Sequence, residues 1–434
     1  MPTHSIHAIV LRFLATFLLA STYTTAHAQE SSTAKKWYKG NTHTHSLWSD
    51  GDAAPEIVVE WYKEHGFDFL CLSEHNIFGN GSVQRWYPIL RGTPLNPKRV
   101  EGLQEKYGMD AVELKHEHKR DYMRLKTIPE LQKQFEAPEE FLLIPAEEIT
   151  SNYPPIHVNA INIRELAPAV NFVDTIEGIV ANFEFVRNQS EKYNIPTLAT
   201  FNHPNWRDGF PVETVLDIDG PMTFEIFNGH PYVWNFGDPD TYKISYDRFW
   251  DIALAIRLKR DPRNMLYGIA VSDSHEYFKM GPKEANPGRG FVMVQAEALT
   301  PNAIVTALQK GDYYSSSGVM LNSIETTKQS MSINIQTEPE VAYTIQFIGT
   351  RKGFDDFYVP VVDKEGNERY DRSRVYSDDI GEVLLETTDN PAKYRFKGNE
   401  IYVRAKIVSS KPLDSPFTEG GTQTAWVQPV LIDP

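Results

Sequence analysis

Cysteine and basic residues are both scarce in this chain. Only one of its 434 residues is a cysteine, Cys71, so no disulfide can form within the chain. Cys71 lies in the apolar segment 67–72, where we expect a small buried hydrophobic residue rather than a catalytic thiol. Lysine and arginine number 43 against 58 aspartates and glutamates, for a formal net charge of −15. This balance argues against non-specific nucleic-acid binding, although an acidic chain can still hold a cationic site for a small anionic substrate.

Long apolar runs are also missing. The apolar run at residues 13–20 is far short of the ~20 residues that a membrane span requires. It follows Arg12, the one charged residue among the first 28, and it precedes the small-x-small sequence Ala26-His27-Ala28. This order predicts a secretory signal peptide at residues 1–28, cleaved near Ala28. We therefore expect a periplasmic or secreted protein without a membrane anchor.

Several common catalytic motifs do not occur. The chain has no His-Glu-x-x-His, no Gly-x-Ser-x-Gly, no phosphate-binding Gly-x-x-x-x-Gly-Lys-Ser/Thr and no Gly-x-Gly-x-x-Gly. A metal-free catalytic triad would need a serine that no motif marks. The absences favour a metallohydrolase whose ligands are dispersed along the chain.

Residue types that bind metals do occur, beginning with His43 and His45. Two residues apart in an extended strand, they place both imidazoles on the same side. Asp50 follows after a short polar turn, and His75 ends the next apolar run. First-row transition metals bind such mixtures of imidazole and carboxylate. For His43 and His45 alone, a surface loop that happens to carry histidines is the alternative.

Strand-like and helical segments alternate through the first three quarters of the chain. A helix is expected from Pro55, which is tolerated at a first helical position, until Gly66 stops it. Further strands are expected at 141–149, 157–163, 197–203, 223–228, 266–272 and 290–296, with helices near 175–193, 245–260 and 301–310. This alternation predicts a parallel α/β barrel.

Potential ligands fall at the ends of these expected strands. Glu148 lies in the strand at 141–149, and His157 opens the next one. His203 follows the strand at 197–203, and Asp273 and His275 follow the strand at 266–272. Catalytic sites of α/β barrels are built at the C-terminal ends of their strands. A single histidine there is more often structural, but six histidines with three carboxylates in equivalent places predict a metal site.

The remaining segments suggest the domain organisation. Residues 77–140 are rich in charge and aromatic side chains, and they are predicted to be a helical insertion that can cap a site. His116 and His118 lie two apart in its expected helix and so would not share a face, which predicts solvated residues rather than ligands. After Gly318, short alternating runs predict an antiparallel β-sandwich. We thus expect a signal peptide at 1–28, a barrel at 29–320 and a β-rich domain at 321–434.

The order of the motifs resembles that of a known family. The motifs are His43-x-His45-x4-Asp50-Gly51, Ser73-Glu74-His75-Asn76, Glu148-Ile149-Thr150, His157, Asn202-His203-Pro204 and Ser272-Asp273-Ser274-His275. Over roughly residues 36–318 this series resembles the PHP (polymerase and histidinol phosphatase) superfamily. Glu74 departs from the pattern, since many members have Asp there. The signal peptide, the β-rich tail and segment 287–318 make the chain more similar to the exported branch that includes carbaryl-hydrolase-type metallohydrolases.

The resemblance implies a distorted seven-stranded (β/α) barrel with two or three divalent ions (Zn, Mn or Fe) at the strand ends. The implied ligands are His43, His45, Asp50, His75, Glu148, His157, His203, Asp273 and His275. Glu148 is preferred over Glu147 because the glutamate of the family directly precedes an apolar residue and Thr; it typically bridges two ions.

The expected chemistry is metal-assisted hydrolysis, in which the ions lower the pKa of a water and stabilise developing charge. Arg207 and Arg289 are candidates for holding an anionic group, and His230 for lining the pocket. Trp206 and Tyr277 are candidate apolar walls. For each of these residues a structural or surface role is the alternative.

Three functions follow in order of preference. The first is a phosphoesterase for a small phosphomonoester or phosphodiester. The second is a carboxylester or carbamate hydrolase on the same metal site. The third is a binding protein of the cell envelope with a vestigial site, which the intact set of ligands disfavours. A small-molecule substrate is expected in the first two cases, and no nucleic acid as a stable partner.

Overall fold

The computed structural model describes residues 35–432 except 152, 169, 208, 239, 240, 242, 418 and 419. The expected signal peptide and its cleavage site lie outside the described residues. In this described part, the helices are too short or too polar to cross a bilayer.

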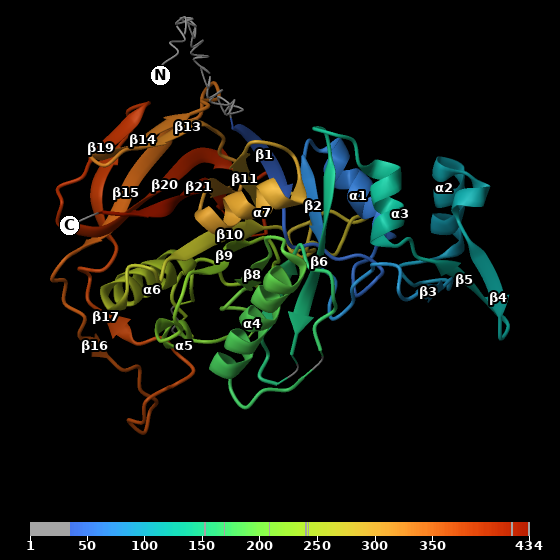
Figure 1. Cartoon of the computed structure of the whole chain (residues 1–434), viewed down its shortest axis with the longest axis horizontal. Helices are drawn as coiled ribbons and strands as arrows, with labels where there is room; N and C mark the ends of the chain where they lie inside the picture. Colours follow the sequence, from blue (N-terminus) through green and yellow to red (C-terminus); the bar gives the residue numbers. More distant parts are fainter. Residues whose placement is uncertain are drawn as a thin grey trace, which may run out of the picture. The chain divides into compact units, whose positions relative to one another are not determined.

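Most strands belong to one large mixed sheet (Figure 1). Its first half is a series of seven strands: β1 (Lys36–Asn41), β2 (Phe69–Leu72), β6 (Leu142–Thr150), β7 (His157–Ile161), β8 (Leu198–Phe201), β9 (Met222–Asn228) and β10 (Leu266–Val271). They neighbour one another in this order. The strands predicted from 141 to 272 are therefore confirmed.

The prediction of a wholly parallel barrel was wrong for two strands. β1, β2 and β6 run parallel to one another, as do β8, β9 and β10. The strand predicted at 290–296, which is β11 (Phe291–Ala296), is antiparallel to β1, and β7 is antiparallel to both of its neighbours. Only residues 151–156 join β6 to β7, and a link this short cannot make the crossover that parallel strands need. The reversal brings the start of β7 to the edge where the other strands end.

The two ends of this strand series meet just beyond β1 and β10. Thr44 and Ser274 form a parallel β-bridge. The amide of Asp273 donates to the carbonyl of His43, and the amide of His45 donates to the carbonyl of Ser274, both at 3.0 Å. The stretches that carry the histidine pair and the Asp-x-His pair are therefore hydrogen-bonded side by side.

Helices connect the strands, and four of these five lie where the sequence predicts them; the short α5 was not predicted. They are α1 (Pro55–Glu64), α4 (Thr175–Tyr193), α5 (Glu213–Leu216), α6 (Tyr246–Arg260) and α7 (Pro301–Lys310). Side chains of Asp174, Ser245 and Thr300 accept hydrogen bonds from amides of the first turns of α4, α6 and α7. α4 packs on β7 and β8, α6 on β9 and β10, and α7 on β11 (Phe291–Ala296).

The insertion at 77–140 is only partly helical. It holds α2 (Pro97–Tyr107), a short 3-10 turn (Met109–Ala111) and α3 (Ile128–Phe135), with a small sheet of β3 (Trp86–Pro88), β4 (Leu114–Glu117) and β5 (Arg120–Arg124). The helix predicted around His116 and His118 was wrong, because β4 and β5 form a hairpin whose turn residues His118 and Lys119 both have positive φ. Both histidines are exposed, as predicted.

The C-terminal strands continue the large sheet in antiparallel fashion. From β11 it passes through β12 (Tyr313–Ser316), β21 (Thr422–Leu431), β20 (Glu400–Pro412) and β15 (Tyr343–Arg351) to β18 (Glu382–Thr387). A separate sheet of β13 (Leu321–Thr326), β14 (Ser330–Ile335) and β19 (Ala392–Arg395) shares a buried cluster with it, and β16 (Tyr358–Val359) pairs with β17 (Val375–Tyr376). The domain boundary near residue 320 stays a prediction.

Candidate metal centre

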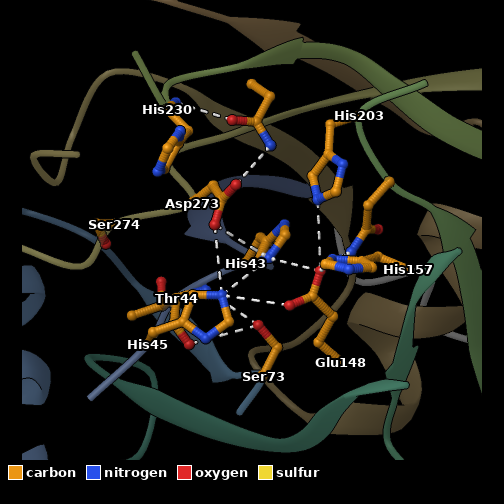
Figure 2. Close-up of polar contacts among 12 residues, drawn as sticks. His43, Thr44, His45, Ser73, Glu148, His157, His203, His230, Asp273 and Ser274 are labelled. Carbon is orange, nitrogen blue, oxygen red and sulfur yellow. Dashed lines mark hydrogen bonds and ion pairs between the residues drawn. The ribbon is translucent and has the colours of Figure 1, made fainter. Parts of the chain in front are cut away.

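Nine side chains predicted as ligands gather at one edge of the strand series. Figure 2 shows six of them: His43, His45, Glu148, His157, His203 and Asp273. The nine residues follow or end β1, β2, β6, β8 and β10, and His157 opens β7. Because β7 is antiparallel and pairs His157 with Thr150, this first residue lies beside the end of β6. The fold therefore brings together residues that are up to 232 positions apart, from His43 to His275.

Glu148 lies in the middle of the cluster. Its carboxylate is buried, and ring nitrogens of five histidines lie around it. The distances from a carboxylate oxygen to a ring nitrogen are 3.4 Å for His43, 3.5 Å for His45, 2.8 Å for His75, 2.9 Å for His157 and 3.5 Å for His203. A carboxylate in this position can bridge two ions, as the sequence resemblance implies.

Asp273 forms a second contact point. Its Oδ1 lies 3.2 Å from Nε2 of His43 and 3.3 Å from Nε2 of His45. Its Oδ2 accepts a hydrogen bond of 3.0 Å from the side-chain amide of Asn228. His43 and His45 thus lie between two carboxylates, those of Asp273 and Glu148.

Asp50 marks the side of the cluster that is open to solvent. Its carboxylate oxygens lie 3.5 Å from Nε2 of His75, 3.4 Å from Nε2 of His275 and 3.7 Å from Nδ1 of His45. The Asp50 side chain is 56% exposed, whereas His43, His45 and Glu148 are buried. A substrate can therefore approach the cluster at Asp50.

The facing atoms are arranged for a cation. Nδ1 of His43 is 2.6 Å from Oε1 of Glu225, so this nitrogen carries the proton and the lone pair of Nε2 faces inward. That Nε2 is only 3.1 Å from Nε2 of His45, and both nitrogens also face carboxylates. Acceptors that converge in this way, with one buried oxygen of Glu148 lacking a hydrogen-bond partner, fit a positive ion.

Three overlapping groups of ligand atoms can each hold an ion. One group comprises His45, Asp50, His75 and His275, a second comprises His43, His45 and Glu148, and a third comprises His75, Glu148 and His157. In each group the ligand atoms lie within 4.8 Å of one another. His203 and Asp273 border these groups through their contacts with Glu148 and His43.

The pKa values of the cluster are strongly shifted. Burial alone would raise the pKa of Glu148, but His75 and His43 lower it well below its usual range. Burial, together with repulsion from His275 and His75, lowers the pKa of His45 to about 3. Burial would also lower the pKa of His75, but Glu148 and Asp50 raise it to about 11. The carboxylates are ionised and His45 is neutral, which are the forms that bind metals. The raised pKa of His75 reflects the negative charge of Glu148 and Asp50, which a bound cation would offset.

Several residues that fix the ligands were missed from the sequence. Glu225, in the middle of β9, binds the ring of His43 through Oε1 and the backbone amide of His203 through Oε2, the latter at 2.8 Å. The side-chain amide of Asn202 donates to Glu148 at 2.8 Å, and the hydroxyl of Thr150 lies 2.7 Å from Nδ1 of His75. A glutamate between Phe224 and Ile226 in an apolar strand is a signal that could have pointed to Glu225.

The neighbouring acids Glu147 and Glu74 lie outside the cluster. Glu147 is on the other face of β6, where Oε2 accepts from the amide of Ala167 at 2.9 Å, and burial raises the pKa of Glu147 to about 8. Glu74, which replaces the more usual Asp, accepts hydrogen bonds from the amide and hydroxyl of Ser46 and from Ser49. Its role is to hold the loop between His45 and Asp50.

The two candidate arginines lie in different settings. Arg289 is buried, and it donates to the carbonyls of Ser415, Gly229, Glu284 and Gly281 at 2.6–3.0 Å, with Asn286 Oδ1 at 3.5 Å. All five donors of its guanidinium thus face protein acceptors and hold loops together. Arg207 is exposed and lies over the ring of Trp206, 4.4 Å from its centroid.

Of the other candidate pocket residues, His230 and Trp206 border the cluster and Tyr277 does not. The ring of His230 is 5.4 Å from that of His275, at the border of the cluster. Trp206 lies 5.1 Å from His157 and 5.3 Å from His203 between ring centroids, so it walls one side. Tyr277 is buried, and its hydroxyl lies 2.7 Å from that of Ser274 beneath the cluster, which places it in the core.

Comparisons with known proteins find similarity among solved structures alone. No protein-family model and no curated protein matches the chain. Among solved structures, the chain is similar to the crystal structure of a two-domain protein from Bacteroides vulgatus that contains a predicted PHP-like metal-dependent phosphoesterase. The identity is 15%, over 91% of this chain and 95% of the other, with a TM-score of 0.36. The function proposed for this chain is therefore based on its own residues.

Proposed function

We propose that this chain is a PHP-type metal-dependent hydrolase, a phosphoesterase acting on a small phosphomonoester or phosphodiester. The observation that carries the proposal is the convergence of six histidines and three carboxylates on one buried point around Glu148. The series of seven strands whose ends meet at Thr44 and Ser274 supports a distorted seven-stranded barrel of the same type.

Two or three divalent ions, such as Zn, Mn or Fe, would be held by the nine ligands. Such ions supply an activated water and stabilise charge on the reacting oxygens. The protein residues contribute orientation: Glu225 fixes the tautomer of His43, and Asn202 and Asn228 each bind a ligand carboxylate. The cluster opens at Asp50, where the reacting ester would enter.

His230 is the proposed hydrogen-bond donor to the substrate. Burial lowers the pKa of His230 to about 4 against the attraction of Asp273, so the ring is neutral near pH 7. Its Nδ1 accepts a hydrogen bond of 3.2 Å from the amide of Tyr232. The proton therefore sits on Nε2, from which the ring can donate a hydrogen bond to an oxygen of the bound ester.

A carboxylester or carbamate hydrolase is the second candidate. The hydrogen-bond donors of Arg289 face protein carbonyls, so this arginine is not available to bind a phosphate group. This favours the second candidate. For a phosphoester, the proposal assigns the binding of the negative charge to Arg207, whose guanidinium lies over the ring of Trp206 at the edge of the cluster. Export to the periplasm or medium is part of the proposal and is based on the N-terminal sequence pattern.

A panel of matched p-nitrophenyl substrates tests the reaction class. The protein beginning at Gln29 is assayed with added Mn or Zn on a phosphomonoester, a phosphodiester, a carboxylester and a carbamate, beside His43→Ala. We expect metal-dependent turnover of a phosphate ester that His43→Ala abolishes. Turnover of the carboxylester or carbamate alone would establish the second candidate. Bound metal without turnover of any ester would overturn both and leave a binding protein.

A further inference from the structure

A cavity of about 660 Å³ opens beside the candidate metal centre. Trp48, Asn76, Phe78, Trp86, Tyr87 and Leu166 are among the residues that line it. Its volume lies in the range of small-molecule sites, roughly 300–1,000 Å³. None of the nine ligand residues lines it, so it is a compartment separate from the metal centre itself.

Three of the cavity walls are attached to the metal centre through different strands. Trp48 precedes Asp50 by two residues, and Asn76 directly follows His75. These two ligands form the solvent-open side of the cluster, with Asp50 and His75 in contact at 3.5 Å. Two residues of the cavity lining are thus close neighbours in the chain of the ligands at the solvent-open side of the cluster.

The third wall is attached through β6. Leu166 precedes Ala167, whose amide donates to Glu147 at 2.9 Å. Glu147 is the direct neighbour of Glu148, the central carboxylate of the cluster. Because each wall is fixed to a different ligand-bearing strand, the position of the cavity relative to the metal centre is fixed as well.

The loop that closes the cavity is held at both ends by backbone hydrogen bonds. The carbonyl of Gly79 accepts from the amide of Ile128 at 2.7 Å, and the carbonyl of Arg85 accepts from that of Leu125 at 2.9 Å. Gly79 lies directly against the indole of Trp48. The indole nitrogen of Trp48 in turn donates to the carbonyl of Lys126 at 2.8 Å. The floor and the loop ends are thus rigid, while Val83 in the loop is exposed.

The surface of the cavity is suited to a flat apolar group. Trp48, Phe78, Trp86 and Tyr87 present aromatic side chains, and Leu166 adds an aliphatic one. Aromatic rings bury a large apolar area and prefer offset or edge-to-face contacts with other rings. Arg85 and four uncharged polar residues, Asn76, Asn80, Ser82 and Gln84, also line the cavity. The aromatic walls favour a phenyl-sized group, and the polar residues leave room for polar substituents on it.

We propose that this cavity binds an aromatic or similarly flat apolar group on the leaving alcohol of the substrate, while the ester lies at the metal centre. The inference rests on the proposed hydrolase function and names its substrate class: esters with an aromatic alcohol part of about the size of a phenyl or indolyl ring. The insertion at 77–140 then determines specificity, because it supplies most of the walls.

The test compares 2-phenylethyl phosphate with ethyl phosphate, whose leaving alcohols are similarly acidic. We expect the protein to prefer the phenylethyl ester by about tenfold or more in kcat/KM, from burial of the ring. Val83→Trp and Leu166→Trp add bulk at two separate residues of the cavity lining and should remove most of that preference without changing turnover of ethyl phosphate. Val173→Trp is the matched control, since Val173 is 83% exposed and does not line the cavity.

A binding measurement separates this proposal from the proposed activity. Titration calorimetry with 2-phenylethylphosphonate and ethylphosphonate on the Zn-loaded protein needs no turnover. Tighter binding of the phenylethyl compound that Val83→Trp abolishes would support the cavity even where neither ester is hydrolysed, in which case only the phosphoesterase function fails. Equal binding of both phosphonates, or an unchanged preference in Val83→Trp and Leu166→Trp, would overturn the proposal.

Discussion

Oε1 of Glu225 lies 2.6 Å from Nδ1 of His43, and both side chains are buried. Oε2 of the same carboxylate accepts two further hydrogen bonds of 2.8 Å, from the amide of His203 and the side chain of Asn228. Through Asn228 the network reaches Asp273. One carboxylate that is not itself in the cluster therefore orients three of the candidate ligands.

This network predicts the effect of Glu225→Gln. The amide NH2 would replace one acceptor oxygen and face a donor of His43, His203 or Asn228. We expect Zn or Mn affinity to fall about 10–100-fold, as for other residues that orient metal ligands. Competition with a chromogenic chelator measures this, with Glu184→Gln as an exposed control. Unchanged affinity in Glu225→Gln would show that the contact serves the fold alone.

The proposed hydrogen-bond donor gives a second prediction. His230→Leu should lower kcat about a hundredfold by removing the ring N–H that binds an oxygen of the reacting ester, with KM and metal content nearly unchanged. Tyr232→Phe is the control, since Tyr232 offers its backbone amide, not its hydroxyl, to His230. Elemental analysis separates the alternatives, because loss of bound metal in His230→Leu would identify the residue as a ligand instead.

The surroundings of Arg289 predict a loss of stability rather than of substrate binding. Arg289→Met leaves the buried carbonyls of Gly229, Glu284, Gly281 and Ser415 without their donor. We expect the free energy of unfolding to fall by about 3 kcal/mol, given the cost of unpaired buried polar groups. Denaturant melts and steady-state kinetics on the same variant decide the question. A raised KM with unchanged stability would make Arg289 an anion-binding residue after all.

Much of the candidate ligand set could be predicted from the sequence because most of its residues follow or open a short apolar run. His203 and Asp273 are examples, since the strands β8 and β10 that precede them are buried and bounded by polar residues. The orientation of β7 could not be read in this way, because periodicity carries no strand direction. The short link at 151–156 does indicate that β7 is antiparallel to β6, because it cannot make the crossover that parallel strands need.

Other parts depended on contacts between distant residues. Glu225 was overlooked because its partners His43 and Asn228 are brought to it only by the fold, and a single acid in a strand does not specify them. The hairpin at 114–124 could not be predicted because its residues are mostly charged and show no alternation of apolar and polar side chains. Its turn at His118 and Lys119 also lacks the glycine or asparagine that usually marks positive φ.

A buried ion-pair network between α6 and β20 predicts how stability depends on pH. Asp247 of α6 lies 3.2 Å from Arg404 and 2.6 Å from Lys406, both of β20. Burial alone would raise the pKa of Asp247, but Lys406 and Arg404 lower it below its usual value. The native state therefore binds fewer protons than the unfolded chain near that value. The stabilisation is present above the ordinary carboxyl pKa and is lost as the pH falls through the lowered one.

Asp247→Asn should therefore cost about 1–3 kcal/mol of unfolding free energy at pH 7, since it leaves part of the charge on Arg404 and Lys406 unpaired. The difference from the unsubstituted protein should stay constant from pH 7 to about 5, and shrink below about pH 4, where the wild-type carboxylate begins to take up its proton. Urea melts at several pH values measure it, with Asp378→Asn as an exposed control. A difference that grows on acidification would have the wrong sign for a carboxylate held in its ionised form. It would show that Asp247 is not stabilised by the two cations of β20.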